Sequence, residues 1–203
     1  MTNAPCLNRG ITQKNKIMSG NFQWNAACCS AKTLKGKKQN IIGNMMEGSK
    51  MKLKDYQTEL LNAAEKAMEK AYNPYSNFYV GAALLTTDDK IITGANYENA
   101  AYGNTMCAER SALLRANAEG YRKFKAIAII ARGENFDMDQ PISPCGACRQ
   151  SLFEASQISD VDIEVIMSNT KKDTVIIKKI SELLPYAFGP LDLGVNIEKY
   201  KRV

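Results

Sequence analysis

The stretch CAERSALLRANAEG, residues 107–120, carries alanine and leucine at three- and four-residue steps and ends in glycine. This pattern predicts a helix over 105–119 that stops at Gly120. A second stretch, PCGACRQSLFEA at 144–155, opens with Pro-Cys-x-x-Cys and continues as a predicted helix over 147–155. Cysteines therefore fall in the opening turns of both predicted helices, and the fold has to explain how those two helix starts meet.

The remaining elements predict an alternation of helices and strands. An amphipathic pattern over 52–72 predicts a first helix, which Asn73 and Pro74 end. Apolar or alternating runs predict five strands, at 78–86, 90–95, 125–131, 161–167 and, more weakly, 174–178. We therefore expect a three-layer α/β/α domain with a mixed central sheet, and with the two cysteine-bearing helices side by side on one face.

The chain has 203 residues and a formal net charge of +6, which fits one sizeable domain. The charge is unevenly distributed, because residues 1–50 carry +7 and residues 51–203 carry −1. We expect 1–50 to be a basic, disordered extension and 51–203 to be the folded domain. A nearly neutral domain argues against a nucleic-acid substrate, which would call for a basic groove.

The extension has two open interpretations. It is acid-poor like an organelle transit peptide, but arginine is scarce and no amphipathic period is visible, so an unstructured extension or a start at Met51 is favoured. Cys6, Cys28 and Cys29 lie in it and receive no role. The chain offers no apolar run near the roughly 18 residues that span a bilayer, so we expect a cytoplasmic protein without a membrane partner.

The cysteines at 107, 145 and 148 have the spacing of a catalytic zinc site. Three protein ligands leave the fourth tetrahedral position for water, and Glu109 would act as the acid or base beside it. Three thiolates give a Zn²⁺ site a charge of −1, so we expect a guanidinium to compensate them, Arg110 first and Arg149 second. The chain contains no histidine, which excludes histidine-based catalysis and histidine metal ligands.

The Cys-x-x-Cys pair has two other interpretations. A redox pair leaves Cys107 and the proline before Cys145 unexplained. A structural zinc knot needs a fourth ligand, and 51–203 has neither a histidine nor a fourth cysteine.

The domain resembles the short, homotetrameric, three-cysteine cytidine deaminases. The resemblance runs through PYSNFYVGAALL, GANYENAAYGNTMCAERSALL, SPCGACRQ and LLPYAFGP, and the zinc-deaminase signature that it contains is highly specific. It implies one zinc per subunit on Cys107, Cys145 and Cys148, with Glu109 moving a proton from water to N3 and then to the departing amino group. Cytidine and 2′-deoxycytidine would become uridine and 2′-deoxyuridine, with release of ammonia, in pyrimidine salvage.

The same resemblance implies which residues meet the nucleoside. They are Asn96 and Glu98 at the ribose, Phe78 against the base, the Ala108 N–H at the ring carbonyl, Tyr102 from a subunit boundary, and Phe188 closing a neighbouring subunit's site. From the residues alone, Phe78 and Phe188 are better interpreted as core aromatics and Asn96 as a turn residue. Tyr79 and Tyr97 depart from the family pattern, which carries proline and a small aliphatic residue there.

Three rival functions stay open at this point. A deaminase of nucleotides or nucleic-acid bases would use the same zinc and glutamate, and so would a deaminase of a modified nucleoside antibiotic. A zinc-stabilised scaffold could bind nucleosides without turning them over. Residues suited to a free ribose favour cytidine and deoxycytidine.

Overall fold

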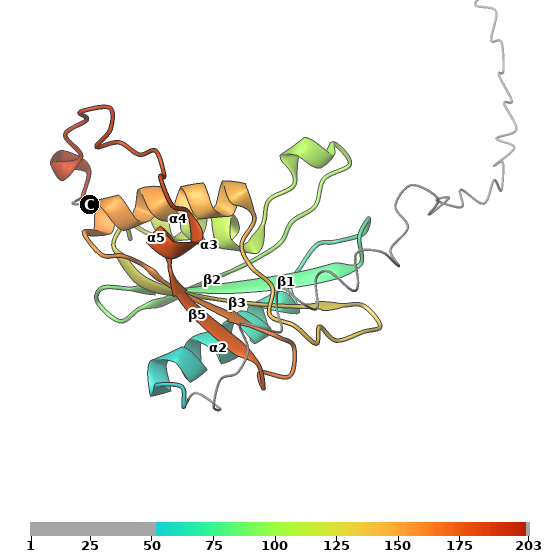
Figure 1. Cartoon of the computed structure of the whole chain (residues 1–203). Helices are drawn as coiled ribbons and strands as arrows, with labels where there is room; N and C mark the ends of the chain where they lie inside the picture. Colours follow the sequence, from blue (N-terminus) through green and yellow to red (C-terminus); the bar gives the residue numbers. More distant parts are fainter. Residues whose placement is uncertain (1–51, 202–203) are drawn as a thin grey trace, which may run out of the picture. The chain divides into compact units, whose positions relative to one another are not determined.

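The computed structural model describes residues 52–201, and within them five strands form one mixed sheet in the order β2-β1-β3-β4-β5 (Figure 1). The strands are β1 Phe78–Thr86, β2 Ile91–Ala95, β3 Phe124–Gly133, β4 Glu164–Ser168 and β5 Val175–Lys179. β1 pairs antiparallel with both β2 and β3, β3 pairs parallel with β4, and β4 pairs antiparallel with β5. The predicted mixed sheet is confirmed.

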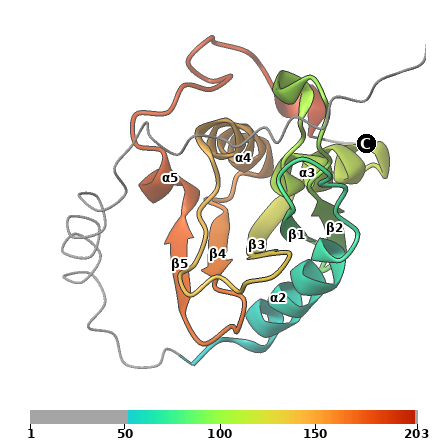
Figure 2. The same ribbon diagram turned by 90° about the vertical axis from the view of Figure 1, so that its right-hand side faces the viewer.

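Helices cover both faces of this sheet. α2 (Asp55–Met68) lies on one face, and α3 (Ala108–Ala118) and α4 (Gly146–Ser159) lie side by side on the other (Figure 2). A short α5 (Ile180–Leu183) and two 3-10 turns, η1 (Tyr102–Asn104) and η2 (Glu198–Tyr200), complete the described elements. The three-layer prediction is confirmed. No helix among residues 52–201 has both the length and the apolar character needed to cross a membrane.

The central strands are buried on both sides, which explains their unbroken apolar sequence. In β1, Ala82 and Leu84 pack into the core beneath α3 and α4, whereas Ala83 and Leu85 pack against α2. Because successive side chains of a strand point to opposite faces, one apolar run supplies both cores.

The first helix is shorter than its sequence pattern predicts. It begins at Asp55, where the Gln57 side chain accepts the Lys54 N–H at 2.9 Å, and it ends at Met68 rather than at 72. Tyr72 instead donates its N–H to the Asn96 carbonyl at 3.0 Å. A backbone pairing with the segment after β2 therefore replaces the last predicted turn.

The helix predicted over 105–119, which is α3, also begins later than predicted. Tyr97 and Met106 exchange two backbone hydrogen bonds of 2.9 Å, which keeps the chain extended before Cys107. α3 starts at Ala108, and Cys107 becomes its N-cap residue, with φ −69° and ψ 154°. This shift of three residues from 105 places the cysteine at the tip of the helix.

A glycine lets this helix lie against the sheet. An added Cβ at Gly94 in β2 would lie 2.4 Å from the Ala112 nitrogen and 2.6 Å from the Ala108 oxygen, both backbone atoms of α3. Backbone atoms cannot give way as a flexible side chain can, so any larger residue would push α3 off the sheet.

We therefore expect Gly94→Ala to lower the free energy of unfolding by about 2 kcal/mol, as overpacking of a close contact does. Denaturant unfolding of the zinc-loaded protein measures this. Gly103→Ala is the matched control, since an added Cβ there meets no atom within 4 Å. Equal stability of the two variants would contradict the close-contact explanation.

Candidate active site

Two helix N-termini bring three cysteines together. Cys107 is the N-cap of α3, Cys145 is the N-cap of α4, and Cys148 lies in the first turn of α4. The Cys107 and Cys145 sulfurs are 3.9 Å apart, and the Cys145 and Cys148 sulfurs are 3.5 Å apart. All three sulfurs lie within 4.8 Å of one another, as the sequence predicts.

This arrangement fits a zinc ion. With Zn–S bonds of about 2.3 Å, tetrahedral geometry requires ligand sulfurs roughly 3.8 Å apart. The two sulfur separations lie on either side of that value. Cys148 is buried and Cys145 is exposed, so the cluster reaches from the core to the surface of the domain.

The surroundings of the cluster favour a thiolate at Cys107. A hydrogen bond from the Cys148 thiol lowers the pKa of Cys107 to about 5 despite burial, with further lowering by Cys145 and Arg110. The same hydrogen bond, together with burial, raises the pKa of Cys148, which therefore keeps its proton while Cys107 ionises. Each helix N-terminus adds about half a positive charge, which further stabilises sulfur anions.

Arg110 is the guanidinium that faces the sulfurs. It hydrogen-bonds Cys107, whose thiolate raises the pKa of the arginine against the opposing effect of burial. Its Nη2 donates to the Thr105 carbonyl at 3.1 Å, and its buried Nε has no partner among the described residues. The side chain is thus held in place with a donor unused.

Arg149, the second choice, has other partners. Its guanidinium donates to the carbonyls of Pro144 at 2.9 Å and Leu183 at 3.0 Å, and to the Ser143 hydroxyl at 3.3 Å. These bonds tie the loop before α4 to α5. The contacts favour Arg110 over Arg149 as the compensating cation, and that role stays a prediction.

Glu109 lies beside the cluster in the first turn of α3 and is 4% exposed. Burial raises the pKa of its carboxyl, and the charge of Cys107 raises it further, while Cys148 and Arg110 act in the opposite direction. A carboxyl whose pKa moves toward neutrality is suited to taking up and returning a proton.

Asn96 and Glu98 hold backbone segments, a task that the sequence does not reveal. The Asn96 amide accepts the Val80 N–H and donates to the Phe78 carbonyl, both at 2.9 Å. One Glu98 oxygen accepts the N–H groups of Tyr75 at 3.0 Å and Ser76 at 3.2 Å. An amide and a carboxylate can each take part in about four hydrogen bonds, so these contacts leave capacity on both side chains.

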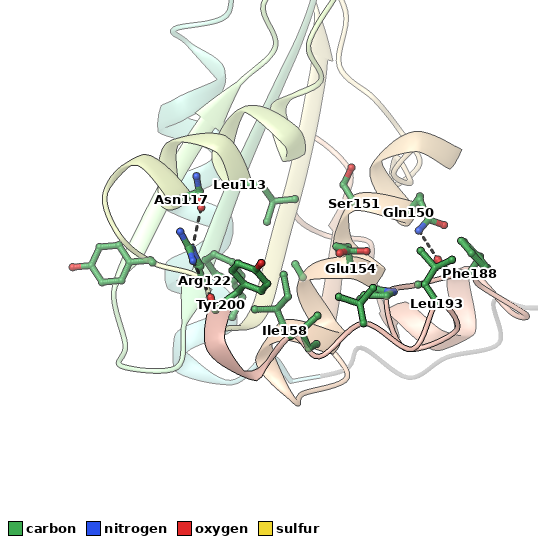
Figure 3. Close-up of a pocket in the computed structure, with 17 residues that line it drawn as sticks. Leu113, Asn117, Arg122, Gln150, Ser151, Glu154, Ile158, Phe188, Leu193 and Tyr200 are labelled. Carbon is green, nitrogen blue, oxygen red and sulfur yellow. Dashed lines mark hydrogen bonds between the residues drawn. The ribbon is translucent and has the colours of Figure 1, made fainter. Parts of the chain in front are cut away.

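The three aromatic residues predicted for the substrate lie in different places. Phe78 opens β1 and points to the same face as Ala82, toward α3 and α4. Tyr102 is 72% exposed. Phe188 lines a separate cavity of about 690 Å³ between α3, α4 and the C-terminal segment, and none of the three cysteines contributes to it (Figure 3). The structure therefore does not bring Phe188 to the cysteines of its own chain.

Neither departure from the family pattern reaches the sulfur cluster. The Tyr79 ring packs on the α2 side of the sheet, with the Arg132 guanidinium 4.2 Å from its centroid. Tyr97 is exposed and stacks on Tyr72 at 5.0 Å between ring centroids. Cys6, Cys28 and Cys29, which received no predicted role, lie outside the described residues.

Replacing Arg110 tests charge compensation. We expect Arg110→Gln to weaken zinc affinity by about 10- to 100-fold, as the loss of a partner of metal ligands does. Competition with a chelator measures the affinity. Arg115→Gln is the control, because Arg115 lies on the same helix and pairs with Glu119 at 2.7 Å. Parent affinity in both variants would show that the helix N-termini suffice.

Glu98 predicts a pH-dependent stability. Burial opposes its ionisation, but hydrogen bonds from Ser76 and from the Tyr75 N–H leave its pKa below the usual value. The ionised carboxylate therefore stabilises the fold above the unfolded pKa of about 4.3, and this contribution is lost as pH falls through the folded pKa.

We accordingly expect Glu98→Gln to unfold more easily than the parent at pH 7, with the gap closing below about pH 4 as the parent carboxylate is protonated. Denaturant titrations of both proteins across this range measure the gap. A gap that stays constant with pH would mean that the negative charge of Glu98 does not anchor the loop.

Comparison with known proteins identifies the family. The model of the cytidine and deoxycytidylate deaminase zinc-binding region matches residues 54–165. The chain is 48% identical over 135 residues to a cytidine deaminase of Halalkalibacterium halodurans. The matched residues make up 66% of this chain and 96% of that protein. The crystal structure of a cytidine deaminase from Burkholderia pseudomallei superposes with a TM-score of 0.59 and 46% identity, covering 67% of this chain and 100% of that one.

The matched region holds every part of the sulfur cluster. Residues 54–165 include all three cysteines, Glu109 and Arg110, and the zinc geometry described above fits the zinc-binding region that the family is named for. The chain therefore belongs to the cytidine and deoxycytidylate deaminase family, and its cofactor is a zinc ion held by three cysteines.

Proposed function

We propose that this chain hydrolyses cytidine and 2′-deoxycytidine to uridine and 2′-deoxyuridine with release of ammonia. The observation that carries the proposal is a zinc-competent sulfur cluster with a buried carboxyl, Glu109, on the same opening turn of α3. The named relatives, which are cytidine deaminases, support this substrate.

The reaction exchanges an amino group for an oxygen. Bound zinc supplies the acidity that makes water a nucleophile at neutral pH. Glu109 takes a proton from the attacking water and delivers it to N3 of the pyrimidine, and it then moves the proton of the new C4 hydroxyl to the departing amino group as the C4 carbonyl forms. One water is consumed and one ammonia leaves, so Glu109 ends the cycle as it began.

The substrate is positioned by groups around this carboxyl. Ala108 is the first residue of α3, so its N–H has no partner within the helix and is free to meet the ring carbonyl. The unused hydrogen-bonding capacity of Asn96 and Glu98 suits sugar hydroxyls, and the Phe78 ring lies against the base. Neither sugar-binding residue is cationic, which favours a nucleoside over a nucleotide.

The complete site includes a second copy of the chain. Tyr102 and Phe188 are 72% and 59% exposed, and the C-terminal segment also exposes Tyr186, Leu191 and Leu193. Such apolar exposure suits burial in a homotetramer in which Tyr102 and Phe188 complete a neighbour's site.

Residues 51–203 form the catalytic domain, and 1–50 are an extension without a catalytic role. The enzyme serves pyrimidine salvage in the cytoplasm.

Removing the carboxylate tests the chemistry. Glu109→Gln should lower kcat for cytidine by at least about 100-fold, because an amide cannot accept the proton from water. Zinc content and oligomeric state should be retained, and a chromatographic uridine assay with metal analysis measures both. Glu119→Gln, past the other end of α3, is the control and should keep the parent rate. Turnover by the Glu109 variant at the parent rate would refute the assigned proton carrier.

A further inference from the structure

The last residue of the PCGACRQ motif, Gln150, has no part in the chemistry described above. Cys145 and Cys148 belong to the sulfur cluster, and Arg149 ties α4 to the segments beside it. Gln150 instead points to the C-terminal segment, where its Nε2 donates to the Phe188 carbonyl at 2.7 Å (Figure 3). This bond joins the zinc-bearing helix to the exposed aromatic residue 38 positions away.

The backbone at Gly189, next to Phe188, also packs closely against α4. An added Cβ at Gly189 would lie 2.5 Å from the Gln157 Oε1 and 2.9 Å from the Phe153 ring. The Gly189 N–H also donates to the Asp192 carboxylate at 2.7 Å. Gln150 therefore holds the carbonyl of Phe188, and packing of Gly189 holds its C-terminal side. The residue itself stays 59% exposed.

The far end of the C-terminal segment has its own anchors. The Lys201 ammonium is nearly buried and contacts Asp160 and Glu198 at 2.7 and 2.6 Å. Arg122 donates to the Tyr200 carbonyl at 2.9 Å (Figure 3). Because these bonds do not involve Gln150, loss of the Gln150 side chain frees the backbone around Phe188 without releasing the whole segment.

We propose that Gln150 is a positioning residue for substrate recognition. It fixes the Phe188 backbone on α4, so that the ring is presented in one orientation to the nucleoside in a neighbouring copy's site. A ring ordered in advance loses less conformational freedom on binding, which lowers KM and leaves the chemical step unchanged. This inference rests on the proposed function, in which Phe188 completes that site.

The experiment compares Gln150→Leu and Gln150→Glu with the parent. Neither replacement side chain can donate to the carbonyl at neutral pH, although glutamate keeps the shape of glutamine. Both variants should raise KM for cytidine about five- to tenfold, the effect of one lost hydrogen bond, with kcat, zinc content and oligomeric state unchanged. A parent KM in Gln150→Glu would overturn the requirement for a donor.

Two further variants serve as the negative and the positive control for this result. Ser151→Ala is the matched control, because the Ser151 hydroxyl donates to the Ala147 carbonyl of the same helix and its loss should leave KM unchanged. Phe188→Ala should raise KM at least as much as Gln150→Leu. If Phe188→Ala raises KM and neither Gln150 variant does, the positioning role is wrong and the proposed function stands. If Phe188→Ala has no effect, the positioning role and the shared site both fail.

Mixed oligomers show in which copy the ring acts. A Glu109→Gln chain has an inactive site but an intact Gln150 and Phe188, whereas a Gln150→Leu chain has intact chemistry. Co-assembly of the two should restore the parent KM in a fraction of the active sites, because the Glu109→Gln chain presents its ring to a neighbour. A KM that stays raised in every mixture would overturn presentation to a neighbouring copy.

Discussion

Three cysteine sulfurs within 4.8 Å of one another are the constraint on which the rest of this domain depends. As thiolates they would repel one another strongly, so the fold has to supply positive potential where they meet. Two helix N-termini provide part of it, and Arg110, whose guanidinium hydrogen-bonds Cys107, is predicted to provide a full charge. Zinc then binds where the protein has already gathered its ligands.

Keeping two helix ends at this spacing requires rigid support from the sheet. α3 lies directly on β2 because residue 94 has no side chain, and the paired backbones of Tyr97 and Met106 fix where the helix begins. Asn96 and Glu98 extend this support by binding the backbone at and before β1. The residues proposed for the sugar are thus also the residues that hold the site in shape, so their substitution affects binding and stability together.

The sequence predicted those features that have a local signal. Period and composition were sufficient for all five strands, both cysteine-bearing helices and the three-layer arrangement, and the cysteine spacing predicted the cluster. The end of the first helix at 72 and the start of the next at 105 were misplaced because pairings with other backbone segments decide them. The tasks of Arg149, Asn96 and Gln150 were not foreseen for the same reason. Their partners are mostly main-chain atoms, up to 38 residues away. Every residue type supplies such atoms, so the sequence does not show which of them will be bonded.

The hydrogen bond of Gln150 gives α4 a second function, because the same motif also carries zinc ligands. Its first turn carries two zinc ligands, and its second turn carries Gln150, which holds the backbone of Phe188. A helix is stiff over one turn, so displacement of Cys145 or Cys148 also displaces Gln150. If Phe188 serves a neighbouring copy, the state of the metal site in one subunit is then transmitted to substrate binding in the next. A substitution that displaces the first turn of α4 would therefore weaken nucleoside binding beyond the subunit that carries it.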